Sequence, residues 1–260
     1  MKKTALITGA SGGIGMDLAK IHAAKGDNLV LVARNKNRLE ELKTQLVKQY
    51  GIDVYTIARD LSVPHSAKQV YDEIKKNKIT VNYLINNAGI GFCGPFTEIP
   101  FENDEKTIQL NITTLTEFNK LFLKDMLAAG SGKIMNVAST AAFQSGPGMA
   151  VYYATKAYVL FLSEAIDSEV RGKGVSVTAY CPGPTETGFF TAGNATESRL
   201  VKLRRPASSM SVAESGYKAM MKGKTVAIPG IMNNLMAFSV RLTPRFIVVA
   251  ITKFLQEKTQ

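Results

Sequence analysis

Residues 8–15 read Thr8-Gly9-Ala10-Ser11-Gly12-Gly13-Ile14-Gly15, and this stretch decides the fold. A short apolar run precedes the glycines at residues 4–8, and a helical pattern follows at residues 14–24. Glycines let the backbone approach an anion, and the free N–H groups and dipole of a helix start favour a phosphate. A strand, a glycine loop and a helix in this order therefore predict a pyrophosphate site. The residues that we expect to form it are Gly9, Ser11, Gly12, Gly13, Ile14 and Gly15.

Short β-rich runs alternate with longer helical patterns along the rest of the chain, without a repeat or a long linker. We expect strands at residues 4–8, 28–33, 54–58, 81–85, 133–137, 175–180 and 225–228. We expect the longer helices at residues 14–24, 38–50, 102–129, 150–171 and 211–222. This alternation, with right-handed crossovers, predicts a single domain over residues 1–260. Its fold class is α/β: a doubly wound, Rossmann-type, seven-stranded parallel sheet flanked by helices in three layers, α/β/α.

Two helices carry signals for their faces and ends. The second helix has one apolar face, formed by Leu39, Leu42, Leu46 and Val47. Gly51 follows it as a C-terminal stop, because glycine adopts the left-handed conformation that ends many helices. Ser62 is the expected N-cap of the next helix, since its hydroxyl can accept a bond from a free N–H group.

The bulk composition excludes several classes of protein. A hydrophobic content of 45% is enough for a sizeable core. Only two cysteines are present, Cys93 and Cys181, which indicates reduced thiols in a cytoplasmic protein. No apolar run approaches the roughly 18 residues needed to span a bilayer, and the run after Met1-Lys2-Lys3 is too short for a signal peptide. The net charge of +11 is scattered and lacks interleaved aromatics, so we expect a solvated basic surface and no nucleic-acid partner. We also expect no metal.

The end of the second predicted strand bears on the choice of cofactor. An acidic residue here would accept from the ribose 2′-hydroxyl of NAD and repel a 2′-phosphate. The chain has Arg34 instead, whose planar cation suits that phosphate. We therefore expect NADPH or NADP+ in preference to NADH. The alternative is an exposed arginine at a helix start, and Arg38 could either assist or be surface charge.

A tyrosine and a lysine lie four residues apart early in a predicted helix. Residues at this spacing share a helical face, so the ammonium of Lys156 is expected near the phenol of Tyr152. The ordinary pKa of tyrosine, near 10, is too high for acid/base work at neutral pH, and we expect the cation to lower it. Such a pair alone is commonplace on helices and usually structural.

Taken together, the motifs resemble those of the short-chain dehydrogenases/reductases, in their compact single-domain branch. The matches are the T-G-x-x-x-G-x-G loop from Thr8, Asp60-Leu61, Asn86-Asn87-Ala88-Gly89, Asn111, Ser139, the Y-x-x-x-K of Tyr152 and Lys156, and Pro182-Gly183. They occur in this order over most of the chain and are highly specific as a set. The resemblance implies hydride transfer between a nicotinamide and a carbonyl or secondary alcohol. It also implies a homodimer or homotetramer built on the helices at 102–129 and 150–171.

The resemblance further implies individual roles. Ser139 would hold the substrate carbonyl oxygen against Tyr152, which would donate or accept a proton. Lys156 would bind the nicotinamide ribose and tune the tyrosine, and Asn111 would distort the long helix and hold a water in a proton relay. The implied cofactor contacts are Asp60, Leu61, Asn87, Ala88, Gly89, Pro182, Gly183, Thr185 and Thr187.

Three of these assignments have alternatives. Ser145 is a rival of Ser139, although only Ser139 follows a strand. Tyr153 also lies on the side of Lys156, and the family spacing is what selects Tyr152. Asn111 could simply be a helix cap.

Substrate choice in the family lies mainly in residues 141–149 and in an insertion, here residues 184–210, which we expect to form a substrate lid. The lid contains Phe189, Phe190 and Leu203, which suggest a partly apolar pocket. Its basic residues are Arg199, Lys202, Arg204 and Arg205. This basic cluster could meet a coenzyme A phosphate or an acidic carrier protein, or it could belong to a solvated lid.

The C-terminal extension, residues 231–260, is longer and more apolar than the minimal family pattern. Two short amphipathic helices about Pro244 are expected in residues 231–255. They could cover the substrate pocket, form part of an oligomer interface, or lie on a membrane surface.

Three functions are compatible with the features of the whole chain. The first is NADPH-dependent reduction of a medium-sized, partly apolar ketone to a secondary alcohol. The second is reduction of a 3-oxoacyl thioester, favoured by the basic charge. The third is a non-catalytic nucleotide-binding regulator, which the presence of all four catalytic residues disfavours.

Overall fold

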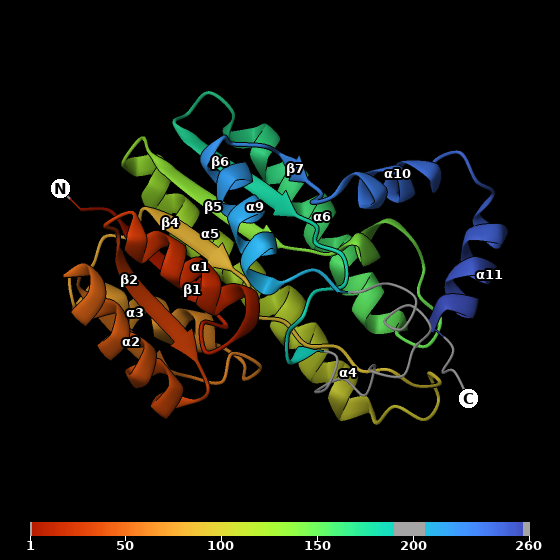
Figure 1. Cartoon of the computed structure of the whole chain (residues 1–260), viewed down its shortest axis with the longest axis horizontal. Helices are drawn as coiled ribbons and strands as arrows, with labels where there is room; N and C mark the ends of the chain where they lie inside the picture. Colours follow the sequence, from red (N-terminus) through yellow and green to blue (C-terminus); the bar gives the residue numbers. More distant parts are fainter. Residues whose placement is uncertain (1, 190–205, 257–260) are drawn as a thin grey trace.

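A seven-stranded parallel sheet forms the centre of the computed structural model, which describes residues 2–189 and 206–256 (Figure 1). The strands are β1 Thr4–Thr8, β2 Asn28–Ala33, β3 Val54–Ala58, β4 Tyr83–Asn86, β5 Gly132–Val137, β6 Val175–Tyr180 and β7 Val226–Ala227. Their order in the sheet is β3-β2-β1-β4-β5-β6-β7. The chain therefore reverses its winding between β1 and β4, and ligands bind at such a switch point, beyond the carboxyl ends of the strands.

Helices cover both faces of the sheet. The elements between and after the strands are α1 Gly13–Ala24, α2 Lys36–Tyr50, α3 Ser66–Lys76, α4 Phe101–Ile108, the π-helical segment η1 Gln109–Thr114, α5 Leu115–Ala128, the 3₁₀ helix η2 Thr140–Phe143, α6 Ala150–Val170, α9 Ser209–Met221, α10 Ile231–Ser239 and α11 Arg245–Gln256. One face packs against α1, α2 and α9, and the other against α3, α5 and α6. The predicted three-layer, doubly wound architecture is confirmed.

Alternate residues of the same strand enter the two layers. Leu6 and Val30 are fully buried on the side of α3 and α5. Ile7 and Leu31 are fully buried on the side of α1 and α2. Because successive side chains point to opposite faces and both faces are covered, the middle of each strand is a continuous apolar run, Ala5-Leu6-Ile7 in β1 and residues 29–33 in β2.

Buried amides tie the middle of the sheet to its helices. Asn86, at the end of β4, donates through Nδ2 to Asn136 Oδ1 of β5 at 2.8 Å. Asn136 Nδ2 donates in turn to Asn119 Oδ1 of α5 at 3.1 Å and to Ser163 Oγ of α6 at 3.0 Å. A buried polar network of this kind favours one arrangement of its elements. The two strands that end beside the site therefore have a fixed position relative to α5 and α6.

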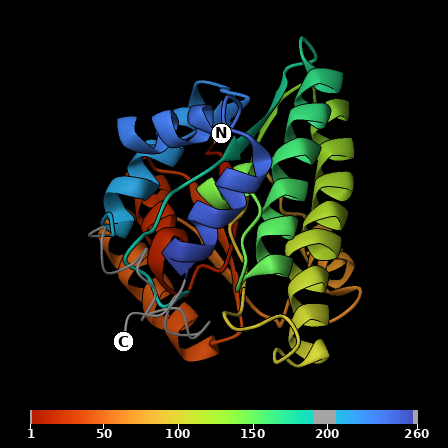
Figure 2. The ribbon, with the colours of Figure 1, turned by 90° about the vertical axis from the view of Figure 1, so that its right-hand side faces the viewer.

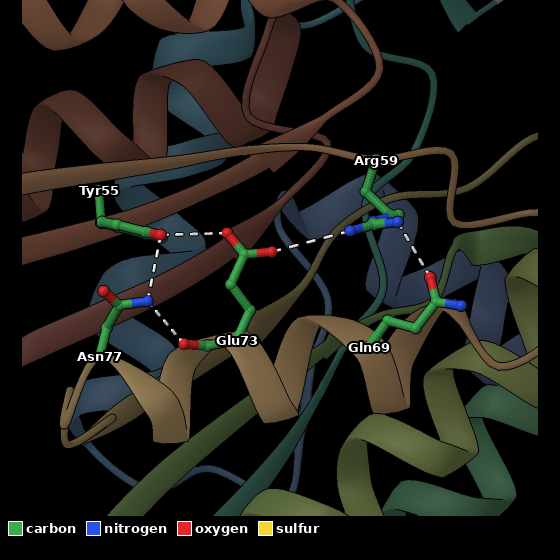
Figure 3. A network of polar contacts seen from close by, with 5 residues as sticks. All are labelled: Tyr55, Arg59, Gln69, Glu73 and Asn77. Carbon is green, nitrogen blue, oxygen red and sulfur yellow. Dashed lines mark hydrogen bonds and ion pairs between the residues drawn. The ribbon is translucent and has the colours of Figure 1, made fainter.

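A second polar network joins the edge strand β3 to α3 (Figure 3). Tyr55 Oη donates to Glu73 Oε1 at 3.1 Å, and Asn77 Nδ2 donates to Tyr55 Oη at 3.2 Å. Glu73 also pairs with Arg59 at 3.7 Å, and Arg59 Nη1 donates to Gln69 Oε1 at 3.0 Å. Because Arg59 directly precedes Asp60, the network fixes the loop that carries this predicted site residue.

Two local predictions need correction. Ser62 does not cap the next helix, which begins at Ser66 after His65 in a left-handed conformation at φ 62°; the Ser62 hydroxyl donates to Asp60 in the turn before it. Val47 is 40% exposed, because the helix turns this edge of its apolar face to the solvent. The helix expected over 102–129 is present, and the local distortion expected at Asn111 takes the form of the π-helical segment at Gln109–Thr114.

Candidate active site

A cavity of about 750 Å³ lies along the carboxyl edge of the sheet. The predicted residues that line it are Gly9, Ser11, Gly12, Gly13, Ile14, Arg34, Asp60, Asn87, Ala88, Gly89, Ser139, Tyr152, Lys156, Pro182, Gly183, Thr185 and Thr187. Segments after six different strands thus meet in one place. Within residues 2–189 and 206–256, no cluster of three or more His, Cys, Asp or Glu side chains could hold a metal ion.

The glycine loop is shaped by close approaches that exclude side chains. Gly9 has φ +68°, and a Cβ there would lie 2.8 Å from Asn87 Nδ2. Gly13 has φ +53°, and its Cβ would lie 2.8 Å from Thr187 Cγ2. Both backbones adopt the left-handed region that favours glycine. The loop therefore packs directly against the segments that follow β4 and β6, and its backbone N–H groups remain at the start of α1, where no acidic residue lies in the first turn.

The end of β1 organises the loop after β4. Thr8 Oγ1 accepts hydrogen bonds from the backbone N–H groups of Asn87 at 3.0 Å and Ala88 at 2.9 Å. Asn87 Nδ2 donates back to the carbonyl oxygen of Thr8 at 2.9 Å. These reciprocal bonds hold both loops in register, so Asn87, Ala88 and Gly89 face the same cavity as the glycine loop.

Positive charge gathers at the rim beyond the glycine loop. Arg34 and Arg38 both line the cavity there, together with Lys106 from α4. Asp60 lies beside them and accepts from Ser62 N at 2.9 Å and from Ser62 Oγ at 2.7 Å. Burial alone would raise the pKa of Asp60, but these bonds, with help from Arg34 and Lys106, hold the pKa below its usual value. Asp60 is therefore a carboxylate beside a cationic rim.

The other end of the cavity brings together the three predicted reacting side chains. Ser139 caps η2, accepting from Ala141 N at 3.1 Å, and donates to the carbonyl oxygen of Pro182 at 3.4 Å. A hydrogen bond with Ser139 acts on the Tyr152 phenol. A Cβ at Gly91 would lie 2.5 Å from Tyr152 Cδ2, so only a glycine lets the tyrosine ring take this position.

Lys156 lies beneath this ring and is buried. Its Nζ donates to the carbonyl oxygen of Val137 at 2.7 Å and lies 5.7 Å from the centre of the Tyr152 ring. Burial lowers the pKa of Lys156 to about 8. The Val137 carbonyl thus fixes the position of the ammonium near the tyrosine ring.

The expected fall in the pKa of Tyr152 is not found among the protein groups. Burial raises this pKa strongly, and the bond with Ser139 opposes the rise only in part. The physical reason is that removal from water destabilises the phenolate, while Lys156 Nζ donates to the carbonyl oxygen of Val137. The surroundings of Tyr152 therefore favour the neutral phenol.

Asn111 lies inside the π-helical segment and is buried behind the cavity. Its Oδ1 accepts from Ile90 N at 3.1 Å, and its Nδ2 donates to Ile90 O at 2.8 Å and to Thr155 Oγ1 at 3.0 Å. Thr155 Oγ1 donates to the carbonyl oxygen of Tyr152 at 2.7 Å. The predicted distortion of the long helix is present, and Asn111 links it to the tyrosine and to the loop after β4.

Three predicted site residues do not line the cavity: Gly15, Leu61 and Asn111. Gly15 acts in packing, because a Cβ there would lie 2.5 Å from both Gly9 O and Asn87 Nδ2. Leu61 turns its side chain into the core, and its carbonyl oxygen accepts from Thr114 Oγ1 at 2.8 Å. These residues therefore contribute packing and hydrogen bonds beneath the residues that line the cavity.

The chain matches a known family of proteins. The family model described as "short chain dehydrogenase" matches residues 3–198. This chain belongs to the short-chain dehydrogenase family. It is an oxidoreductase with the fold and the family motifs of that group.

This short-chain dehydrogenase has relatives with named activities. It is 31% identical over 224 residues to the very-long-chain 3-oxoacyl-CoA reductase of Rattus norvegicus, covering 84% of this chain and 67% of the relative. A short-chain dehydrogenase from Sphingobium yanoikuyae, solved in complex with NADPH, has a TM-score of 0.83 at 32% identity and covers 92% and 93% of the two chains. A bulky-bulky ketone specific alcohol dehydrogenase from Comamonas testosteroni has a TM-score of 0.78 at 30% identity, with the same coverage.

The far walls of the short-chain dehydrogenase cavity include residues that the sequence did not single out. From the core fold these are Gly91, Phe92, Asn103 and Lys106, and from α10 and α11 they are Asn233, Met236, Thr252, Leu255 and Gln256. Gln256 Nε2 donates to Tyr153 Oη, next to Tyr152 in the chain. The helical period of the C-terminal segment indicates that inward residues recur every three or four positions, but it does not indicate that the polar side of α11 faces the cavity. The greater part of the predicted lid, residues 190–205, lies outside the described residues, including Phe190, Leu203 and the basic cluster.

Proposed function

We propose that this chain reduces a ketone to a secondary alcohol with NADPH as hydride donor. One observation carries the proposal: a single cavity joins a glycine loop with an arginine rim at one end to Ser139, Tyr152 and Lys156 at the other. An elongated dinucleotide fits between these two ends.

The protein groups fit such a cofactor. The start of α1 offers free N–H groups to a pyrophosphate, and a Cβ on Gly9 or Gly13 would collide with Asn87 or Thr187 and disturb the loop that presents them. Arg34, with Arg38, would bind the 2′-phosphate. Lys156 would bind the nicotinamide ribose, while the remaining lining residues after β3, β4 and β6 would hold the adenosine and the carboxamide. The NADPH complex of the Sphingobium relative supports this choice.

The reaction follows from the positions of the hydroxyl groups. Bound NADPH would supply a hydride to the carbonyl carbon of the substrate. Ser139 Oγ would donate to the carbonyl oxygen, and Tyr152 Oη would deliver its proton to that oxygen as negative charge develops there. The high pKa of Tyr152 keeps this proton in place until it is needed. Asn111, through Thr155, would act as a positioning residue for the helix turn that bears Tyr152. A water held by Asn111 would return a proton to Tyr152 after each turnover.

A 3-oxoacyl thioester is the second candidate substrate. Support comes from the rat reductase and from four apolar side chains among those that line the cavity, Met149, Phe189, Met236 and Leu255. A fatty chain would lie along these side chains with its 3-oxo group at Tyr152.

The assembly is proposed to be a homodimer or homotetramer in the cytoplasm. Tyr158 and Phe161 of α6 are 37% and 66% exposed, and Ile108 of α4 is 41% exposed. These apolar side chains on adjacent helices suit contact with a second copy. The low cysteine content supports a reducing compartment.

The decisive experiment measures NADPH consumption over a panel of aliphatic ketones, aromatic ketones, steroid ketones and 3-oxoacyl thioesters. Turnover of one class that disappears in Tyr152→Phe would support the proposal and name the substrate. Tight NADPH binding without turnover across the panel would contradict it and favour a regulatory protein.

A further inference from the structure

The C-terminal helices α10 and α11 expose a large apolar surface. Figure 2 shows both helices in front of the rest of the molecule, at the end toward which the strands run in Figure 1. The side chains that are more than half exposed are Ile231, Met232, Leu235, Phe238, Leu242, Phe246, Ile251 and Phe254. Contiguous exposed apolar groups on this scale mark an interaction site rather than ordinary surface. We name the outer side of residues 231–254 the apolar plateau.

The polarity of α11 is the reverse of that of an ordinary surface helix. Thr252 and Gln256 face inward and are 6% and 7% exposed, and both line the cavity. The outward side carries Phe246 and Ile251, which are 75% and 53% exposed. A helix that packs on a protein core in water normally turns its apolar side inward. This helix turns its polar side toward the cavity and its apolar side away from the protein. Another apolar medium must therefore cover the outer side.

The charge of residues 231–256 indicates which apolar medium covers the outer side of α11. Residues 231–256 contain three cations, Arg241, Arg245 and Lys253, and no carboxylate. An interfacial helix inserts its apolar side at the boundary of headgroups and acyl chains, and nearby Lys and Arg bind anionic headgroups. None of the helices formed by the described residues is long and apolar enough to cross a membrane. We propose that the apolar plateau docks on the surface of a bilayer that contains anionic lipid.

A second copy of the chain is the competing occupant. In a two-fold interface the same patch faces its own copy, so the three cations of one copy would face a surface that carries the same cations. The segment has no carboxylate to neutralise them, whereas anionic headgroups would. The surfaces on α4 and α6, where an oligomer interface is proposed, belong to different elements. Charge therefore favours lipid over self-association at the plateau.

Docking would connect the cavity to the lipid phase. Met236 of α10 and Leu255 of α11 line the cavity, while other residues of the same two helices form the plateau. The bilayer and the cavity would then be separated by the thickness of one helix layer. An apolar substrate could pass from lipid to the site without crossing bulk water. The docking itself rests on the plateau and its charge, and is independent of which substrate is reduced.

The test is flotation of the full chain with vesicles. Vesicles of phosphatidylcholine alone are compared with vesicles that also contain phosphatidylglycerol, at low and high salt. We expect the protein to float with the mixed vesicles and to be partly released by salt. The double variant Leu242→Ser/Phe246→Ser should lower the partition by about tenfold for each side chain that no longer enters the lipid. Arg241→Gln/Arg245→Gln should abolish the preference for phosphatidylglycerol.

Phe101→Ser is the matched control, because Phe101 is 73% exposed and belongs to α4 rather than to α10 or α11. It should float like the original protein. NADPH binding, followed by fluorescence, should be unchanged in all variants and shows that each is folded. No flotation with either vesicle would overturn the proposal. So would equal losses in the control and the double variant, or conversion of a dimer to a monomer by the double variant without vesicle binding.

Discussion

Arg34 provides a direct test of how the chain selects its cofactor. It is exposed at the cavity rim, beyond the glycine loop, where Arg38 and Lys106 also lie. Replacing Arg34 with alanine removes the cation that we assign to the 2′-phosphate. NADH lacks this phosphate, so the substitution should weaken NADPH binding and leave NADH binding unchanged.

The structure sets the size of the effect. A hydrogen bond to a charged group contributes about 1.5–3 kcal/mol, and exposure to solvent places Arg34 at the lower end of this range. About 1.4 kcal/mol corresponds to a tenfold weaker Kd for NADPH. Arg38 remains at the rim and would retain part of the preference, so Arg34→Ala/Arg38→Ala should lose more. High salt should reduce the difference between NADPH and NADH in the original protein.

Fluorescence titration of both reduced cofactors measures this without knowledge of the substrate. Lys36→Ala is the control, because Lys36 is exposed near Arg34 but does not line the cavity. The control should leave both Kd values unchanged. Equal weakening of NADPH and NADH in Arg34→Ala would refute the assignment, as would an unchanged NADPH Kd.

Three further predictions concern catalysis and stability. Tyr152→Phe should lower kcat by about 10²–10⁴-fold, the usual contribution of a positioned proton donor, with the NADPH Kd unchanged; a variant that keeps its turnover would exclude Tyr152 as the acid. Burial lowers the pKa of Lys156 to about 8, so the ammonium is present below that pH, and kcat/KM should fall as pH rises through about 8; a flat profile well above this pH would contradict a role for the charged lysine. Phe118 is 1% exposed in the core, so Phe118→Ala should lower the free energy of unfolding in urea by about 3–5 kcal/mol. Val63→Ala, at a position 52% exposed, should change the free energy of unfolding by about 0.5 kcal/mol or less.

Much of the fold could be predicted because the strands are buried on both faces. Such strands form short apolar runs between glycines and polar turns, and β1, β2, β3 and β6 match the predicted ranges residue for residue. The helix ends were less certain, since flanking residues such as Lys36 continue the helical backbone without an apolar signal. Ser62 shows why a capping residue is ambiguous in sequence: its backbone N–H and its hydroxyl both donate to Asp60 Oδ1 in the turn before the helix, which begins only at Ser66.

The candidate site was predictable where it rests on spacing, and less so where it rests on packing. The glycine loop and the Tyr152/Lys156 pair have local patterns that bring them to the cavity. The pKa of Tyr152 depends instead on how much water the folded chain removes from the phenol. The inward position of Gln256 depends on a contact with Tyr153, 103 residues away. Neither the pKa of Tyr152 nor the inward position of Gln256 can be predicted from the residues nearby in the sequence.

The π-helical segment at Gln109–Thr114 also has a consequence for the history and the engineering of this chain. A π turn holds about one residue more than an α turn, so it behaves as a one-residue insertion that the helix absorbed. Deleting one residue there would restore a continuous α-helix and leave the turns on both sides facing as they do now. If the undeleted segment were wound as a regular α-helix instead, everything after it would be rotated by about 100° about the axis, and Phe118 and Phe122, now buried, would turn away from the sheet. Alignments and designs that treat Phe101–Ala128 as one regular helix will therefore place one of its two halves on the wrong face.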